Sequence, residues 1–206
     1  MPEMATQSQL EYKTTAPASG KYIYYPGTTE IPEASAARTL GVSFKILAEV
    51  EFAGDSKGVI CAQGSRFGGY SMFVRDGQLQ FVYNFPGIAP EQKLSCPAPK
   101  PGKHIVGVAF DKKSISKNLE ALGTMTLYVD DKAVASADFR TQTGHYSLAG
   151  EGLCIGHDSG DTVSGAYRGE GKYAFSGGGI VKVVYDIADD AYVDVERKFA
   201  AKIARD

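Results

Sequence analysis

Glu49 and Glu51 are two carboxylates with the spacing that lets one strand point two acids into the same cleft. Glycoside cleavage needs such a pair, one residue acting as nucleophile or base and the other as acid. Both glutamates alternate with apolar residues in 43–52, so they belong to the polar face of a half-buried strand, where charges normally meet water. No aromatic walls or second acid accompany them. A weak glycoside hydrolase or lyase is therefore the alternative hypothesis, and a solvated strand face is the favoured interpretation.

Nucleophilic catalysis would need a Ser or Cys that converges in space with a His and an orienting acid. The three histidines are far apart in the sequence, and none lies in a recognisable nucleophile motif: His104, His145 and His157. The cysteines are odd in number and widely spaced, which favours free, buried thiols over disulfides or a zinc site: Cys61, Cys96 and Cys154. We therefore expect no catalytic residue.

The segment 156–161 places two carboxylates and several carbonyl groups within one short, glycine-containing loop. Calcium prefers six or more oxygen ligands, and Asp158 and Asp161 supply only a few of them. An Asp/Gly turn with no metal explains the same residues. Calcium at Asp158 and Asp161 is thus one prediction, and an ordinary turn is the other.

A group of aromatic and hydrogen-bonding residues is suited to contact a sugar or a protein partner. Its members are Arg66, Phe67, Tyr70, Tyr83 and Asn84. Core packing explains the tyrosine rings equally well, so the sequence leaves both interpretations open.

Composition predicts one large β domain. It also argues against a nucleic-acid partner and a membrane span. The 206 residues fit a single core, and 24 Gly, 12 Tyr and 10 Phe with no Trp are typical of short strands joined by tight turns. The net charge is −2, and no run of Lys or Arg exceeds a pair, so nucleic acid is not expected. The polar start has no signal-peptide pattern, and no apolar stretch approaches the roughly 20 residues of a membrane span. For the chain as written, these features predict a cytoplasmic location.

Period-two patterning identifies the strands that must position these residues. In 43–52, Phe44, Ile46, Ala48, Val50 and Phe52 alternate with mostly polar residues, which predicts a strand with one buried face. Asp76-Gly77 between two alternating runs predicts a hairpin, after which Leu79, Phe81, Tyr83 and Phe85 share one face. The cluster Gly177-Gly178-Gly179 predicts a bulge or a close approach of two backbones.

The expected fold is all-β, a two-sheet antiparallel jelly-roll sandwich with a short C-terminal helix. Residues 1–20 are predicted to form a flexible or edge extension, 21–187 the sandwich, and 188–206 the helix. Asp189 and Asp190 fit its first turn, and Lys198, Lys202 and Arg205 lie late, as the helix dipole prefers. Its apolar residues fall near helical spacing: Tyr192, Val195, Phe199 and Ile203.

Several short segments occur in an order that is more specific than any one of them alone. They are Tyr25-Pro26-Gly27 with Ile31-Pro32-Glu33, Gly58 to Gly64, Arg66 to Tyr70, Val82 to Phe85, Pro101 to His104, Leu127 to Asp130, and Glu151 to Tyr167. This series resembles the C-terminal β-sandwich behind the catalytic domain of a group of bacterial arylsulfatases, itself similar to concanavalin A-like lectin and glucanase jelly rolls. The resemblance covers about Lys21 to Ile187.

The resemblance does not bring sulfatase chemistry with it. Sulfatases mature a Cys or Ser that is followed by Pro two residues later and Arg four residues later, whereas Cys96 is followed by Ala98 and Lys100 at those positions. We therefore expect a non-catalytic binding or scaffold domain that engages a protein partner or a saccharide. A protein partner is preferred, because exposed loops and an amphipathic terminal helix are suited to docking.

Overall fold

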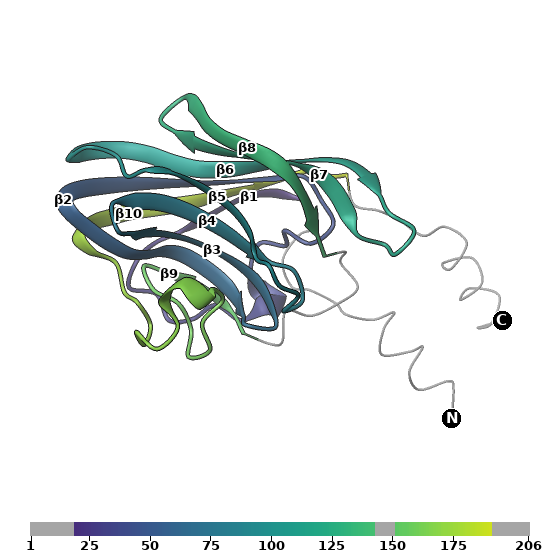
Figure 1. Cartoon of the computed structure of the whole chain (residues 1–206), viewed down its shortest axis with the longest axis horizontal. Coiled ribbons are helices and arrows are strands. Elements are labelled where there is room, and N and C mark those ends of the chain that lie inside the picture. The colour runs from purple at the N-terminus through teal and green to yellow at the C-terminus, as the bar shows by residue number, and fades with distance from the viewer. Residues whose placement is uncertain (1–18, 143–150, 191–206) are drawn as a thin grey trace.

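The computed structural model describes residues 19–142 and 151–190 of the chain (Figure 1). In these ranges the strands are β1 (Gly20–Tyr24), β2 (Phe44–Ser65), β3 (Gly68–Arg75), β4 (Gln78–Asn84), β5 (Gln92–Pro97), β6 (Gly102–Ile115), β7 (Ala121–Val129), β8 (Lys132–Thr141), β9 (Leu153–Ile155) and β10 (Ser176–Ile187). Two short 3-10 helices accompany them, η1 (Glu33–Ser35) and η2 (Gly165–Tyr167). No helix in these ranges is long and apolar enough to cross a membrane.

The strands form two packed sheets that share their longest strand, β2. In sheet A the order is β1-β10-β2-β6-β7-β8, and β2 contributes residues 44–52. In sheet B the order is β9-β2-β3-β4-β5, and β2 contributes residues 58–65. Every one of these pairings is antiparallel, and Figure 1 shows the two layers facing each other. The expected jelly-roll sandwich is confirmed.

The first half of β2 shows why the sequence folds into two layers. Its predicted inner residues, Phe44 to Phe52 at every second position, are all buried in the main core, whereas Lys45 and Glu51 are exposed. Successive strand residues point to opposite sides, so one face packs against sheet B while the other meets water. The predicted strand and its buried face are confirmed.

The hairpin between β3 and β4 turns at Asp76-Gly77, as predicted. Asp76 has a φ of 50° and Gly77 a φ of 69°, the positive values that a type I′ turn requires. This turn sets the register in which Tyr70 pairs with Tyr83 and Met72 with Phe81. These side chains all belong to the main core.

The centre of the core contains polar atoms that other buried groups satisfy. The Tyr70 hydroxyl donates to Gln63 Oε1 at 2.8 Å and lies 3.3 Å from the Tyr185 hydroxyl. Burial raises the pKa of the Cys61 thiol to about 12, so this thiol stays protonated at neutral pH. The three cysteines are free and buried, as the sequence predicted.

The glycine cluster of β10 forms a bulge against the middle of β2. The register shifts between Ser176 and Gly178. Gly178 has a φ of 141°, and a Cβ at this position would lie 2.1 Å from the Glu51 carbonyl oxygen. The predicted bulge and close backbone approach are both present.

The ends of the chain agree only in part with the expected boundaries. β1 begins at Gly20, and the rest of the predicted extension, 1–18, lies outside the described residues. Residues 188–190 are not helical, and the remainder of the predicted terminal helix, 191–206, also lies outside them. Asp190 instead accepts hydrogen bonds from the Ser43 amide (2.8 Å) and hydroxyl (2.6 Å).

Two isoleucines on opposite faces of sheet A test this architecture. Ile46 is fully buried, whereas Ile105 is 48% exposed. Ile46→Ala is expected to lower the free energy of unfolding by about 2–5 kcal/mol, because it leaves a cavity in the core. Ile105→Ala should change it by no more than about 0.5 kcal/mol. Urea unfolding of both variants measures the difference, and equal losses would contradict the assignment of the two faces.

Candidate functional site

The exposed residues with binding chemistry gather where three loops meet at one end of sheet B. Arg66 and Phe67 form the tip of the hairpin between β2 and β3, between the paired residues Ser65 and Gly68. The loop after β4 packs against this tip, since a Cβ on Gly87 would lie 3.2 Å from the Arg66 carbonyl oxygen. We define the hairpin-tip site as Arg66, Phe67, Ile88 and Asp161.

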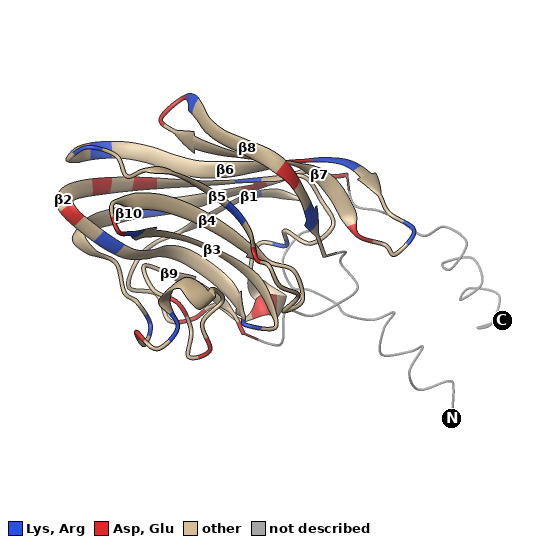
Figure 2. Cartoon of the chain, viewed as in Figure 1, with Lys and Arg blue, Asp and Glu red and all other residues tan. Residues whose placement is uncertain are grey.

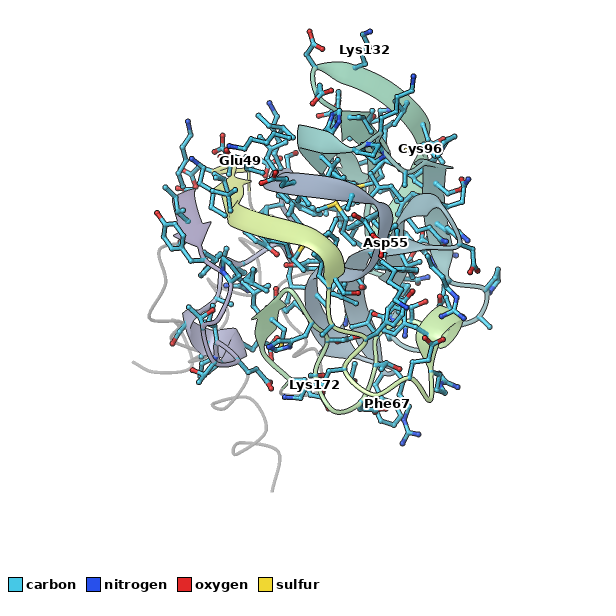
Figure 3. All side chains as sticks on the ribbon, turned by 90° about the vertical axis from the view of Figure 1, so that its left-hand side faces the viewer. Glu49, Asp55, Phe67, Cys96, Lys132 and Lys172 are labelled. Carbon is cyan, nitrogen blue, oxygen red and sulfur yellow. The ribbon has the colours of Figure 1, made fainter. Side chains whose placement is uncertain are left out.

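Phe67 is the most exposed large apolar side chain of the described residues, at 56%. The guanidinium of Arg66 lies 4.6 Å from the centroid of its ring, within the range of a cation–π contact. Figure 3 shows the Phe67 side chain at the loop end of the molecule, well separated from Glu49. The ring thus offers an apolar surface to solvent beside a cationic group.

Asp161 adds an acceptor to the same surface. Its Oδ2 lies 3.1 Å from Arg66 Nε, and both side chains are partly exposed. An exposed ion pair contributes only about 0–1 kcal/mol to stability, so its groups remain available to other partners at low cost. Ring, guanidinium and carboxylate together supply apolar contact, hydrogen-bond donors and acceptors.

Asn84 holds the three loops in place through hydrogen bonds to their backbones. Its Nδ2 donates to the carbonyl oxygens of Arg66 (2.9 Å) and Val163 (3.1 Å), and its Oδ1 accepts from the Gly87 amide (3.1 Å). The side chain is buried, and an amide that lost these partners would carry the cost of unsatisfied polar atoms. Asn84 therefore fixes the site without forming its surface.

The structure divides the five residues that the sequence grouped together. Arg66 and Phe67 are exposed and adjacent, and Asn84 lies directly beneath them. Tyr70 and Tyr83 face the interior of the sandwich, where the Tyr83 hydroxyl accepts from the Gln142 amide at 2.9 Å. Their rings therefore cannot contact a ligand at the surface. Ligand binding by the exposed residues stays a prediction.

The loop 156–175 covers the outer face of sheet B. Val163 and Tyr167 join Val59 and Phe73 in a second buried cluster, and the rings of Tyr167 and Phe73 are 4.9 Å apart. Glu91 anchors the loop by accepting from Ser164 Oγ (2.8 Å) and the Gly165 amide (2.7 Å). Two apolar residues within a polar segment were the signal for this packing.

Asp158, one of the two predicted calcium ligands, already has three donors within the protein. Its Oδ1 accepts from the Ser159 amide (2.8 Å), and its Oδ2 accepts from the Val163 amide (2.9 Å) and the Tyr167 hydroxyl (2.6 Å). Asp161 pairs with Arg66. Across 19–142 and 151–190, no three His, Cys, Asp or Glu side chains form a group able to hold a metal. As described, the two carboxylates do not make a calcium ligand set, and calcium binding stays a prediction.

The carboxylates of the alternative hypothesis lie on the outer face of sheet A. Glu49 Oε2 is 3.4 Å from Lys182 Nζ, and Glu51 is exposed beside Lys103 on the neighbouring strand. In the view of Figure 2, acidic and basic residues are interspersed along these strands. Nothing described around Glu49 and Glu51 forms a cleft into which both could point.

The histidines have local partners wherever the structure describes them. His104 Nδ1 lies 3.1 Å from Asp130 Oδ2, and its Nε2 lies 3.0 Å from the Lys100 carbonyl oxygen. His157 Nδ1 lies 3.1 Å from the Asp158 carbonyl oxygen. His145 is outside the described residues. The contacts of His104 are those of a packed or capping residue.

Comparisons with known proteins show the fold. No family model matches the chain, and no curated protein matches it. It is similar to the NanB sialidase from Streptococcus pneumoniae with a TM-score of 0.52 and 14% identity, over 86% of this chain and 27% of the NanB chain. The IT-sialidase CBM40 of Ruminococcus gnavus is similar with a TM-score of 0.47 and 13% identity, over 87% of this chain and 97% of its own. The chain thus spans about a quarter of the length of NanB.

The buried carboxyl of Asp158 predicts a pH dependence. Burial raises its pKa above the ordinary 3.8, although the Tyr167 hydroxyl and two amides act in the opposite direction. An acid whose pKa is raised on folding costs stability when ionised, so this cost is absent below pH 3.8 and complete above the folded pKa. The stability of the wild type relative to Asp158→Asn should therefore increase as pH falls from neutral towards 3.8.

Unfolding measured for both proteins across this range gives the difference, and an NMR titration of the Asp158 carboxyl gives the pKa itself. A difference that decreases with falling pH, or a carboxyl that titrates below its ordinary value, would contradict the prediction.

Proposed function

We propose that this chain is a non-catalytic β-sandwich domain that binds a saccharide through the hairpin-tip site. The observation that carries the proposal is the Phe67 ring, more than half exposed and paired with the Arg66 guanidinium. A sugar presents apolar C–H faces and hydroxyl groups together. An aromatic ring beside a donor and an acceptor matches both kinds of surface.

The support beneath the site favours binding over an accidental exposure. Asn84 connects the hairpin tip to two other loops, so the backbone that carries the ring and the charged pair is held before any ligand arrives. Ordering a loop on binding costs free energy, and a preorganised surface reduces that cost. A shallow site can then retain a weakly bound sugar.

A saccharide is also the first ligand class to test because NanB, about a quarter of whose chain is similar to this fold, is a sialidase. The relation to the arylsulfatase C-terminal sandwich stays a hypothesis that the ordered sequence segments support. The absence of the sulfatase motif around Cys96 and the ion pair between Glu49 and Lys182 favour a domain without catalysis. A protein partner at Phe67 and Ile88 is the second candidate, because both side chains are exposed.

A glycan array with neutral and acidic glycans tests the proposal. The wild type is expected to bind a subset of glycans, and Phe67→Ala and Arg66→Ala should each weaken that binding about tenfold or more, which corresponds to ~1.4 kcal/mol. Tyr25→Ala is the matched control, because Tyr25 follows β1 in the other sheet and is similarly exposed at 53%. This variant should bind as the wild type does.

Three results would contradict the proposal. They are glycan binding that Phe67→Ala leaves unchanged, the absence of any bound glycan while a protein partner co-purifies through Phe67, and turnover of a glycan that Glu51→Gln abolishes.

A further inference from the structure

β8 forms an edge of sheet A, because β7 is the only described strand with which it pairs. In Figure 1 the turn end of β8 projects from the rest of the molecule. Ser136, Ala137 and Asp138 in the middle of the strand are exposed, and the Asp138 side chain is 90% exposed. Backbone N–H and C=O groups along such an edge can pair with another strand. The edge of β8 therefore offers a surface for strand pairing.

The side chain of Gln92 shows which backbone groups of β8 face away from β7. Its Oε1 accepts from the Arg140 amide, and its Nε2 donates to the Arg140 carbonyl oxygen, both at 2.8 Å. In an antiparallel ladder, successive residues direct these groups alternately towards the partner strand and away from it. The ladder is regular over 135–141, so the backbone groups of Asp138 and Ser136 also face away from β7. No residue in the described ranges hydrogen-bonds to them on that side.

The open part of this edge is short and symmetrical about Ala137. The Gln92 side chain occupies the edge three residues after Ala137, at Arg140. Three residues before it, Val134 is passed over in the pairing with β7 and forms a bulge. Between these two limits, the outward backbone groups of the regular ladder are those of residues 136 and 138.

We propose that β8 pairs with β8 of a second copy of this chain, antiparallel about a two-fold axis at Ala137. Ser136 of each copy then exchanges backbone hydrogen bonds with Asp138 of the other. Sheet A continues from one copy into the next, as in other cases of strand addition to a sheet edge. The interface is isologous, because the same stretch serves both copies.

Two features of the stretch fit a second copy. In this register the bulge at Val134 of one copy lies opposite the occupied edge at Arg140 of the other, so pairing ends at both limits together. Asp138 is the only charged residue in 133–139, and it faces the neutral Ser136 and not its own copy. Like charges directly opposite each other would destabilise the pairing.

A single cysteine at the axis tests the placement in the full chain. Residues opposite each other in a non-hydrogen-bonded pair have Cα atoms ~4.5 Å apart, which a disulfide can span. Ala137→Cys should therefore form a disulfide-linked dimer at least about tenfold faster than Ala133→Cys, because pairing raises the effective concentration of only the first thiol. Ala133 is also exposed on β8 but lies beyond the bulge. The natural cysteines are buried and should not compete.

Charge changes at Ser136 test the register by sedimentation equilibrium. Ser136→Lys puts a cation opposite each Asp138 and should strengthen the dimer about tenfold, whereas Ser136→Asp puts like charges opposite each other and should weaken it about tenfold. Both variants place a charge at the same exposed position, so each controls for the effect of the other on folding.

Three results would overturn the proposal. They are a wild-type chain that stays monomeric at ~1 mM, equal rates of cross-linking for Ala137→Cys and Ala133→Cys, and a dimer that both charge changes at Ser136 weaken alike. The last result would place Ser136 opposite its own copy.

Discussion

The architecture depends on one strand that belongs to both layers. Residues 44–52 of β2 pair with β10 and β6 in sheet A, and residues 58–65 pair with β9 and β3 in sheet B. Between these halves, Ser56 Oγ accepts from the Ala53 amide at 2.8 Å and so stabilises the passage from one sheet to the other. The inward side chains of both halves, such as Val50 and Ile60, belong to the same main core. The hairpin-tip site follows directly from Ser65, the last residue of this strand, so its exposed ring stands on the most highly paired element of the fold.

Buried and half-buried polar groups in this molecule position loops, and the groups of the hairpin-tip site are exposed at the loop end. Asn84 forms hydrogen bonds with the backbones of three loops. Asp158 holds the loop 156–175 over sheet B, and Glu91 fixes η2. Each of these side chains has hydrogen-bond partners within the protein, as buried polar atoms generally must. Arg66 and Asp161 are partnered only at the surface, where a ligand can compete with them.

Patterns among neighbouring residues predicted the features that depend on local interactions. The alternation from Phe44 to Phe52 predicted a strand and its buried face, and Asp76-Gly77 predicted a turn, because each depends on neighbouring residues alone. Whether the rings of Tyr70 and Tyr83 face inwards depends on the pairing of β3 with β4 and on the packing of two sheets, which no local pattern contains. The role of Asn84 was hidden for the same reason, since its partners Arg66 and Val163 lie 18 and 79 residues away in the sequence. The packing of Tyr167 over sheet B likewise depends on residues that are far apart in the sequence.

Native-state hydrogen exchange along β2 tests the central claim most directly. If this strand joins the two sheets into one cooperative unit, the backbone amides of Ile46 and Val50 in sheet A and of Ile60 and Ala62 in sheet B should exchange with the same free energy, equal to that of global unfolding. They should also respond equally to denaturant. Exchange of either half through a separate opening of distinctly lower free energy would show that the layers unfold independently, and would contradict the account.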